Sequence, residues 1–404
     1  ITATSGQPGA VANIRIRGMG SFSATNEPLY VIDGVPVNSG TMSGSGAGYM
    51  TQAQTNIMST INPNDIENMT IIKDAAAASL YGSRAANGVI LITTKRGKSG
   101  QAKVDFTISG GISNLAMENR PVLNGEDRRT LISEALYNQA IDKGNANPNA
   151  WVATYIDTYA PKPSTGYVDW KDYLLRKHAY SQNYEASITG GDEKSKFLSS
   201  FEYLTQQGMA INSDFERYAA NLAYDRQVSK KLAFNGKITL SKITQNLNEE
   251  RGGCNPYLMT AGYITPSDVP YAADGSYNRS FVFSTTVENV LETMKTDINR
   301  TNVTRIMANG ALTYDIIDGL KLKESLNYDY SSQKDVVYYS LYSYAGPKGA
   351  GDGNAQAGKG FTEWNSIFNS TNLNYIKTFN DKHNLDALVA YEIQDFKRDG
   401  LFYM

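Results

Sequence analysis

Two segments decide the fold of the first hundred residues: IRIRGMGSFSATNEPLYVIDGVPV, from Ile14 to Val37, and INPNDIENMTIIKDAAAASLYGSRAANGVILITTKRG, from Ile61 to Gly97. Short apolar runs alternate in both with Gly, Pro and Asn, which is typical of short strands joined by turns. We expect strands at residues 13–17, 29–32, 68–73 and 88–95. Asp33-Gly34 fits a tight turn between apolar strands.

Two short helices are expected in the second segment. Asn62 can cap a helix that has Pro63 in its first turn and acidic residues close behind. A second helix is expected from Asp74, as its cap, to Tyr81, with four alanines to propagate it and Gly82 to end it.

The two segments resemble the plug domain of TonB-dependent outer-membrane transporters, and specifically the SusC/RagA branch, which imports glycans or peptides. The residues that carry the resemblance are RIRG, PLYVIDGVP, NPNDIENMTIIKDAAAA and YGSRAANGVILITTKRG, and departures such as Met69 and Ala76 are mild. The resemblance implies a mixed α/β plug domain over residues 1–97. It also implies that residues 98–404 are the N-terminal portion of a transmembrane antiparallel β-barrel of about 22 strands with long extracellular loops.

After Gly97 the pattern changes to a two-residue alternation of apolar and polar positions. It is clearest in Lys231–Ser241, where Leu232, Phe234, Ile238 and Leu240 alternate with mostly polar residues. The same signature recurs around 217–225 and 320–329, and more weakly at 104–108, 184–188, 197–203, 306–314, 367–375 and 385–393. About nine strands follow, each with one apolar and one polar face.

The predicted connections between these strands alternate in length. Short turns are expected at 191–194, 228–230, 315–319 and 380–382, and long connections at 113–181, 207–216, 242–300 and 332–363. Outer-membrane barrels have short periplasmic turns and long extracellular loops, so the strand around Phe106 is expected to run outward. The alternative, a soluble antiparallel sandwich or barrel, has no reason to sort loops by length. An amphipathic stretch, Gly125–Ile141, predicts a helix in the first long connection, with Leu131, Ile132, Ala135, Leu136 and Ala140 on one face.

Composition excludes several other classes. A formal net charge of −2 with scattered Lys and Arg gives no footprint for nucleic acid. One cysteine, Cys254, and two histidines leave little material for a disulfide, a zinc site or a His-based catalytic centre. No apolar run approaches the ~20 residues of a spanning helix, and no signal peptide opens the chain.

No catalytic constellation stands out, so we expect no enzyme and no cofactor. The GSGAG stretch at Gly44–Gly48 lacks a P-loop lysine and is interpreted as a plug loop. Charges such as Asp315 and Asp318 fit solvated turns. Asp214 and Asp225 lack a recognisable coordination spacing, so no metal site is expected.

Six plug charges are singled out as candidate plug and barrel contacts: Arg15, Arg17, Asp33, Lys73, Asp74 and Arg84. They form either ion pairs that hold the plug to the barrel wall or ordinary pairs inside the plug. Both interpretations predict damage on mutation, because a buried pair is costly to break one partner at a time.

Aromatic side chains in the outward loops are the ligand-binding candidates, because their faces stack on sugar rings and on peptide side chains. The alternative for each is a place in the membrane-interface girdle or in loop packing. The set is Trp151, Tyr155, Trp170, Tyr257, Tyr263, Tyr338, Tyr339, Tyr342 and Tyr344.

The resemblance implies an outer-membrane location in a Gram-negative bacterium, a SusD-like surface lipoprotein as a lid, contact with outer-membrane lipid, and energy from TonB through a segment missing from this chain. It implies an oligosaccharide or oligopeptide as cargo. A surface receptor that signals occupancy without bulk import is the alternative, and a soluble β-rich binding protein is a third. Nine strands would leave open edges in a bilayer, so the chain is interpreted as part of a longer transporter.

Overall fold

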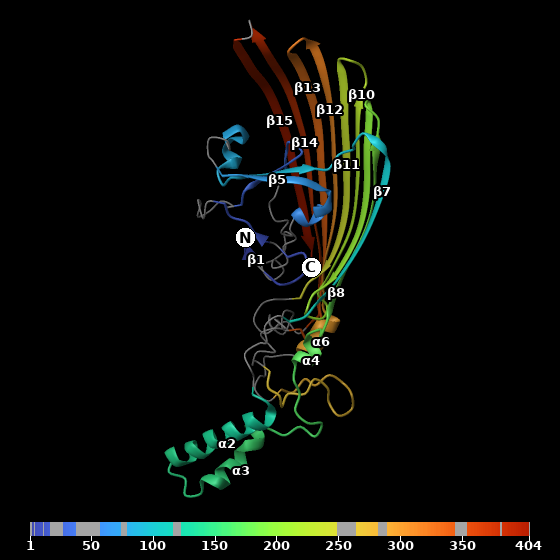
Figure 1. Ribbon diagram of the computed structural model, residues 1–404. Coiled ribbons are helices and arrows are strands. Elements are labelled where there is room, and N and C mark those ends of the chain that lie inside the picture. Colours follow the sequence, from blue (N-terminus) through green and yellow to red (C-terminus); the bar gives the residue numbers. More distant parts are fainter. Residues whose placement is uncertain are drawn as a thin grey trace.

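The computed structural model describes residues 2–3, 5–10, 12–16, 27–37, 57–73, 79–115, 123–248, 264–281, 289–343, 354–379 and 382–403. Two small sheets and short 3-10 helices make up the first part of the chain. A tall curved sheet of nine strands makes up most of the rest. The small part lies against one face of the tall sheet, and we call it the plug (Figure 1).

The plug is built on a four-stranded sheet in the order β4-β3-β6-β5. Its strands are β3 (Leu29–Ile32), β4 (Val35–Val37), β5 (Ile66–Ile72) and β6 (Val89–Thr94). β3 and β6 are parallel, and the other pairs are antiparallel. A two-stranded sheet, β1 (Thr2–Ala3) with β2 (Ala12–Asn13), precedes it. Three 3-10 helices, η1 (Ile57–Thr60), η2 (Pro63–Asp65) and η3 (Ser79–Ala85), connect the strands.

Local turn chemistry in the plug follows the sequence closely. Asp33 and Gly34 have φ of 50° and 86°, which confirms the tight turn between β3 and β4. The Asn62 side chain accepts a hydrogen bond from the Asn64 N–H at 2.9 Å, so the predicted cap is confirmed. It caps a single 3-10 turn, because β5 begins at Ile66, directly after Asp65.

Two plug predictions need correction. The strand expected at 13–17 is limited to Ala12–Asn13, because Ile14 and Ile16 instead pack on the core formed by Tyr30, Ile32 and neighbouring residues. Gly82, expected to end the second helix, has the non-helical φ of 68° and interrupts η3 there, and a further helical turn follows to Ala85. Residues 74–78, where that helix was expected to start, lie outside the described residues.

The nine predicted wall strands are confirmed. They form one antiparallel sheet in consecutive order, β7 to β15. Their bounds are β7 (Gly100–Ser113), β8 (Ala179–Gly191), β9 (Ser195–Gln207), β10 (Asp214–Gln227), β11 (Leu232–Asn246), β12 (Ile298–Ile317), β13 (Leu320–Tyr339), β14 (Gln356–Phe379) and β15 (His383–Tyr403). The fold is a plug followed by a partial barrel.

Short and long connections lie at opposite ends of this sheet, as predicted (Figure 1). The connection expected to be long at 207–216 is an exception, because only residues 208–213 separate β9 from β10. The long connection from β7 to β8 contains α2 (Gly125–Asp142), α3 (Pro148–Tyr159) and α4 (Lys171–Leu174), and the one from β11 to β12 contains α6 (Val290–Thr296). Only α2 was predicted. Its contact face is narrower than expected, because Leu136 is 6% exposed in the packing against α3 but Leu131 is 50% exposed.

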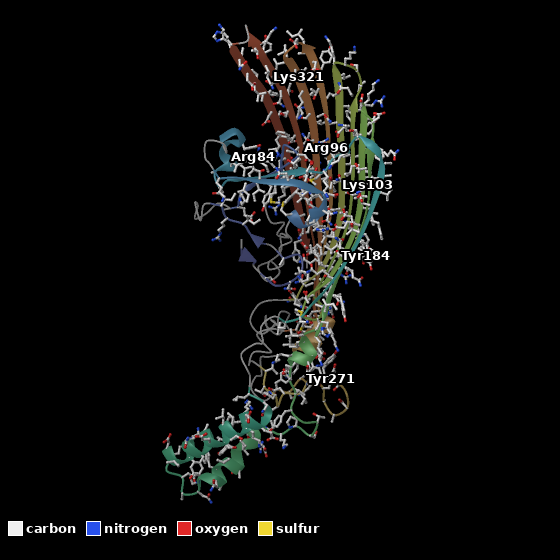
Figure 2. All side chains as sticks on the ribbon, in the orientation of Figure 1. Arg84, Arg96, Lys103, Tyr184, Tyr271 and Lys321 are labelled. Carbon is white, nitrogen blue, oxygen red and sulfur yellow. The ribbon has the colours of Figure 1, made fainter. Side chains whose placement is uncertain are left out.

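The two faces of the tall sheet differ in chemistry. The face against the plug buries polar side chains, among them Glu202, Arg217, Asn221, Lys237, Ser241, Gln245, Arg305 and Asn327. The opposite face exposes apolar ones, among them Phe201, Leu222, Ile238, Leu240, Leu312, Leu326 and Ile367. Figure 2 shows Arg84 in the plug and Lys103 at the β7 edge of the sheet. Within the described part of the chain, no helix is long and apolar enough to cross a membrane.

Candidate functional site

The contact between the plug and the sheet, which we call the plug–wall interface, is the candidate site. Arg217 on β10 is its most connected residue. Its Nε and Nη2 atoms donate to the Glu202 carboxylate on β9, each at 2.9 Å. Its Nη1 atom donates to the backbone oxygens of Ser59 at 2.9 Å and Ile61 at 3.2 Å. The Glu202 carboxylate therefore orients the Arg217 guanidinium, which binds the plug backbone at the C-terminal end of η1.

Arg305 on β12 repeats this arrangement. Its Nε and Nη2 atoms donate to the Asp329 carboxylate on β13, at 2.9 and 2.8 Å. Its Nη1 atom donates to the Thr60 hydroxyl at 3.1 Å. Two wall arginines thus hold the same short plug segment, 59–61, from strands on either side of β11.

Lys237 on β11 reaches the plug sheet between those arginines. Its ammonium lies 3.2 Å from the Asp33 carboxylate and also donates to the Thr94 hydroxyl. Asp33 accepts two further hydrogen bonds from Thr94, from N–H at 2.9 Å and from the hydroxyl at 2.5 Å. Asp33 is therefore hydrogen-bonded to Thr94 within the plug and also paired with Lys237 on the wall. Both interpretations of this charge, a contact inside the plug and a contact with the barrel wall, hold for Asp33.

Asp65, at the end of η2, is a buried plug carboxylate facing the wall. It accepts a hydrogen bond from the Ser200 hydroxyl on β9 at 2.7 Å. Burial raises the pKa of the Asp65 carboxyl, and the Ser200 hydrogen bond and the charges of Lys237, Lys95 and Arg217 offset this only in part. Beside it, the Asn64 amide donates to the Glu185 carboxylate on β8 at 2.6 Å.

The N-terminal segment of the plug is fixed to β11 and the residues just after it by the side chains of two glutamines, Gln245 and Gln7. The Gln245 amide donates to the Pro8 backbone oxygen at 2.6 Å. Gln7 and Asn248 exchange two hydrogen bonds, at 3.1 and 2.8 Å. Gly9 has φ of 75°, and a Cβ there would lie 2.4 Å from the Phe215 ring, so only glycine fits this contact.

A small cavity of about 50 Å³ lies inside the interface, between the plug sheet and β10 to β14. Two of the residues that line it, Asn62 and Asn221, carry amide Nδ2 atoms without a hydrogen-bond partner among the described residues. A cavity of this size admits a few water molecules, which is how buried amides of this kind are paired in proteins. The interface is polar and incompletely packed, which suits two surfaces that separate.

The predicted plug charges divide into three groups. Asp33 pairs with the wall, and Arg84 donates to the Gln394 side chain on β15 at 2.6 Å. Arg15 and Lys73 are exposed, and neither forms an ion pair with a described residue. Arg17 and Asp74 lie outside the described residues.

The sequence prediction missed the residues that carry most of the interface: Arg217, Glu202, Lys237, Arg305, Asp329 and Asp65. A signal was present, because Arg217 and Lys237 occupy the polar positions of alternating strands. A charged residue on the inward face of a barrel strand needs a partner inside. The identity of that partner required the fold.

The aromatic ligand candidates mostly pack within the long connections. Trp170 and Tyr339 are each 3% exposed, and the Trp170 Nε1 atom donates to the Asp268 backbone oxygen at 2.8 Å. Trp151 and Tyr155 pack on each other, with ring centroids 4.6 Å apart, in the small core between α2 and α3.

Two further candidates have partly accessible rings. Tyr338 is partly exposed at the end of β13. The Arg279 guanidinium covers the Tyr342 ring at 3.4 Å from its centroid. Tyr257, Tyr263 and Tyr344 lie outside the described residues, and ligand binding by this set stays a prediction.

Comparison with known proteins agrees with this architecture. Residues 1–89 match the family model described as TonB-dependent Receptor Plug Domain. The TonB-dependent receptor SusC of Bacteroides thetaiotaomicron is 28% identical over 429 residues, which cover 99% of this chain and 38% of that protein. The chain is SusC/RagA-like. The TonB-dependent receptor P39 of Formosa agariphila is also 28% identical, over 97% of this chain and 34% of its own length.

A solved structure of the RagAB peptide transporter has the same fold, with a TM-score of 0.78 at 22% identity over 99% of this SusC/RagA-like chain and 45% of that one. The resemblance to the SusC/RagA branch and the predicted fold class are confirmed. The chain spans about a third of the length of the curated relatives it matches. Those relatives are named as receptors, in agreement with the expectation that this chain is not an enzyme.

Proposed function

We propose that this chain supplies the plug and nine wall strands of an outer-membrane importer energised by TonB, with an oligosaccharide or oligopeptide as cargo and a SusD-like lipoprotein as a lid. One observation carries the proposal: the sheet is apolar on its open face and holds the plug on its polar face through Arg217, Arg305 and Lys237. A soluble sheet buries its apolar face and exposes its polar one. The reverse arrangement fits lipid outside and a wet lumen inside.

The polar plug–wall interface supports import over static binding. Hydrogen bonds and ion pairs between plug and wall exchange readily for hydrogen bonds to water, whereas a packed apolar interface would lose its full burial energy on opening. A pulling force from the periplasm can therefore separate the plug from the wall without unfolding the wall.

The aromatic residues of the long connections remain the proposed cargo contacts, with Trp151, Tyr155, Tyr338 and Tyr342 as the described ones that retain accessible ring surface. They stand at the end of the sheet where the long connections gather, which is the extracellular end in this proposal (Figure 1). Names among the relatives include a peptide transporter and SusC, so peptide and glycan cargo both stay open.

The first test is a pull-down of the native full-length protein from detergent-solubilised outer membranes, followed by mass spectrometry. A stoichiometric SusD-like lipoprotein is the expected result, and a co-purifying oligomer would identify the cargo class. Recovery from the soluble fraction, or from the membrane with neither lid nor TonB, would overturn the importer. An additional periplasmic signalling domain in the full-length protein would favour the receptor alternative.

A further inference from the structure

A hollow interrupts the apolar outer face of the sheet. Gly236 on β11 and Gly310 on β12 are direct cross-strand partners. Strand alternation places both on the outer face, with Ile238 and Leu312. The Phe234 ring lies against Gly236, whereas a Cβ at Gly310 would meet no atom within 4 Å. A hollow of about 640 Å³ opens beside the two glycines. Its walls include Phe197, Leu222, Tyr224, Phe234, Ile238 and Leu326.

The next cross-strand row toward the short turns has a charged residue at each end. Arg226 on β10 lies opposite Phe234, and Leu312 in the same row lies opposite Glu324 on β13. Arg226 is exposed, and its Nη1 atom donates to the Ser195 hydroxyl at 2.7 Å and to the Tyr224 hydroxyl at 3.5 Å. Among the described residues it forms no ion pair. Asp192 in the adjacent turn accepts backbone hydrogen bonds from Lys194 and Ser195 and lies near enough to interact electrostatically with Arg226 without forming an ion pair with it.

Glu324, the other charge of this row, is already engaged. It accepts a hydrogen bond from the Thr371 hydroxyl at 2.6 Å and another from the Asn369 amide. Among the described residues of this row, Arg226 therefore is the cation, and its guanidinium is exposed beside the hollow without an ion-pair partner. An apolar hollow with one fixed guanidinium at its rim matches a molecule with an acyl chain and an anionic head.

We propose that this hollow binds an acyl chain of a glycerophospholipid whose phosphate is held by Arg226. The inference rests on the proposed function, because only a membrane wall presents this face to lipid. Gly236 is four residues from the start of β11, which places the hollow about 13 Å from the short-turn end of that strand. The occupant therefore belongs to the leaflet on the short-turn side, with its head at the polar row and its chain pointing toward the membrane centre.

A glycerophospholipid fits better than a second copy of this chain. A stable interface between copies buries about 1,200–2,000 Å² in total and needs a protruding complement to fill the hollow. The cationic rim would have to face a carboxylate on the outer surface of the second copy. Glu324 there already accepts from Thr371 and Asn369, and Glu216 from the Tyr203 and Tyr218 hydroxyls. A phosphate ester supplies the missing anion and a flexible chain together.

The test is native mass spectrometry of the full-length protein, purified in mild detergent and titrated with phosphatidylglycerol or with uncharged diacylglycerol. Gly310→Leu fills the hollow, and a Cβ at that position meets no atom within 4 Å, so the fold accommodates it. Arg226→Gln removes the cation. Ala220→Leu places the same leucine side chain on the outer face outside the hollow and is the matched control.

We expect one tightly retained phosphatidylglycerol on the wild type and on Ala220→Leu, and at least fivefold lower retention on Gly310→Leu. Arg226→Gln should weaken phosphatidylglycerol retention and leave diacylglycerol unchanged. Equal retention of phosphatidylglycerol by Gly310→Leu and the wild type would overturn the inference. A dimer in the wild type that Gly310→Leu dissociates and Ala220→Leu does not would also overturn it, because the occupant would then be a second copy. If the protein is inserted in the membrane and carries its lid but retains no lipid, the lipid site is contradicted and the proposed function stands. If the protein is soluble, the proposed function itself is contradicted.

Discussion

Arg217 is a buried interface residue whose loss is expected to be costly. It is 5% exposed, and its carboxylate partner Glu202 is 1% exposed. Arg217→Met leaves that carboxylate buried without its cation and removes the donors to the Ser59 and Ile61 oxygens. We expect a loss of about 3–5 kcal/mol in the free energy of unfolding, measured by guanidinium titration in detergent.

A double variant distinguishes the effect of the Arg217–Glu202 ion pair from the effect of side-chain packing. Arg217→Met with Glu202→Met should recover much of that loss, because no buried charge is then unpaired. Lys103→Met is the control, since its pair with Asp105 is largely exposed and contributes about 1 kcal/mol or less. Equal losses in the single and double variants would show that Arg217 acts through packing alone.

The Asp65 carboxyl gives the interface a pH dependence. Its pKa in the folded protein is raised by burial, so the folded state favours the protonated form. The free energy of unfolding should therefore fall as pH rises from the ordinary Asp pKa of about 4 through the raised value, and stay low above it. Asp65→Asn should remove this component while its amide oxygen still accepts from Ser200. Thermal midpoints between pH 4 and 8 test this, and an unchanged slope would contradict it.

Residue partners across the interface were beyond prediction from the sequence. The contact between Arg217 and Ile61 joins residues 156 positions apart, and Arg305 and Thr60 are 245 apart. Strand alternation identified the polar face of β10 and β11, but which plug atom meets each side chain depends on how the plug sits against the wall. Asp33 was identified through its motif, and its partner Lys237 was visible only as a polar strand position.

Elements were far more predictable than partners. Period-two alternation located all nine wall strands, because each must be apolar toward one environment and polar toward the other. The ends of the strands were less predictable, because β13 continues to Tyr339, ten residues beyond the clearest alternation. The helices α3, α4 and α6 were missed, since the first is short, the second is a single turn, and the third lies in a long polar connection.

The helix pair α2–α3 should behave as a separate unit. Its core of Leu136, Ile156 and Ala160 shares no residue with the plug or wall cores. Leu136→Ala should cost this unit about 2–5 kcal/mol, enough to open it locally. We expect faster proteolysis within residues 125–159 and an unchanged guanidinium midpoint for the wall. Leu131→Ala, at a half-exposed position, is the control, and a shifted wall midpoint for Leu136→Ala would show that the two units are coupled.

The whole molecule joins a continuous wall to a plug through polar side-chain contacts, together with the apolar contacts of Met58 and Met307. The wall has continuous backbone ladders between neighbouring strands, whereas the plug is held to it by separate side-chain contacts through Arg217, Arg305, Lys237 and Ser200. If import requires the plug to leave the wall, a covalent bond across this interface should block it without altering the wall.

Asp65→Cys with Ser200→Cys is the pair chosen for that bond, because the Asp65 Oδ1 and Ser200 Oγ atoms lie 2.7 Å apart across the interface. Cys254→Ser removes the single native cysteine from the background. In cells that carry the full-length protein, we expect oxidation to abolish uptake of the labelled cargo oligomer and a reductant to restore it. Each single-cysteine variant should import in both conditions. Non-reducing electrophoresis and mass spectrometry measure how complete the cross-link is. If uptake persists when cross-linking is complete, the plug opens without separating residue 65 from residue 200. The path for cargo would then lie within the plug, since a plug tied to β9 at η2 leaves no way to detach it from the wall.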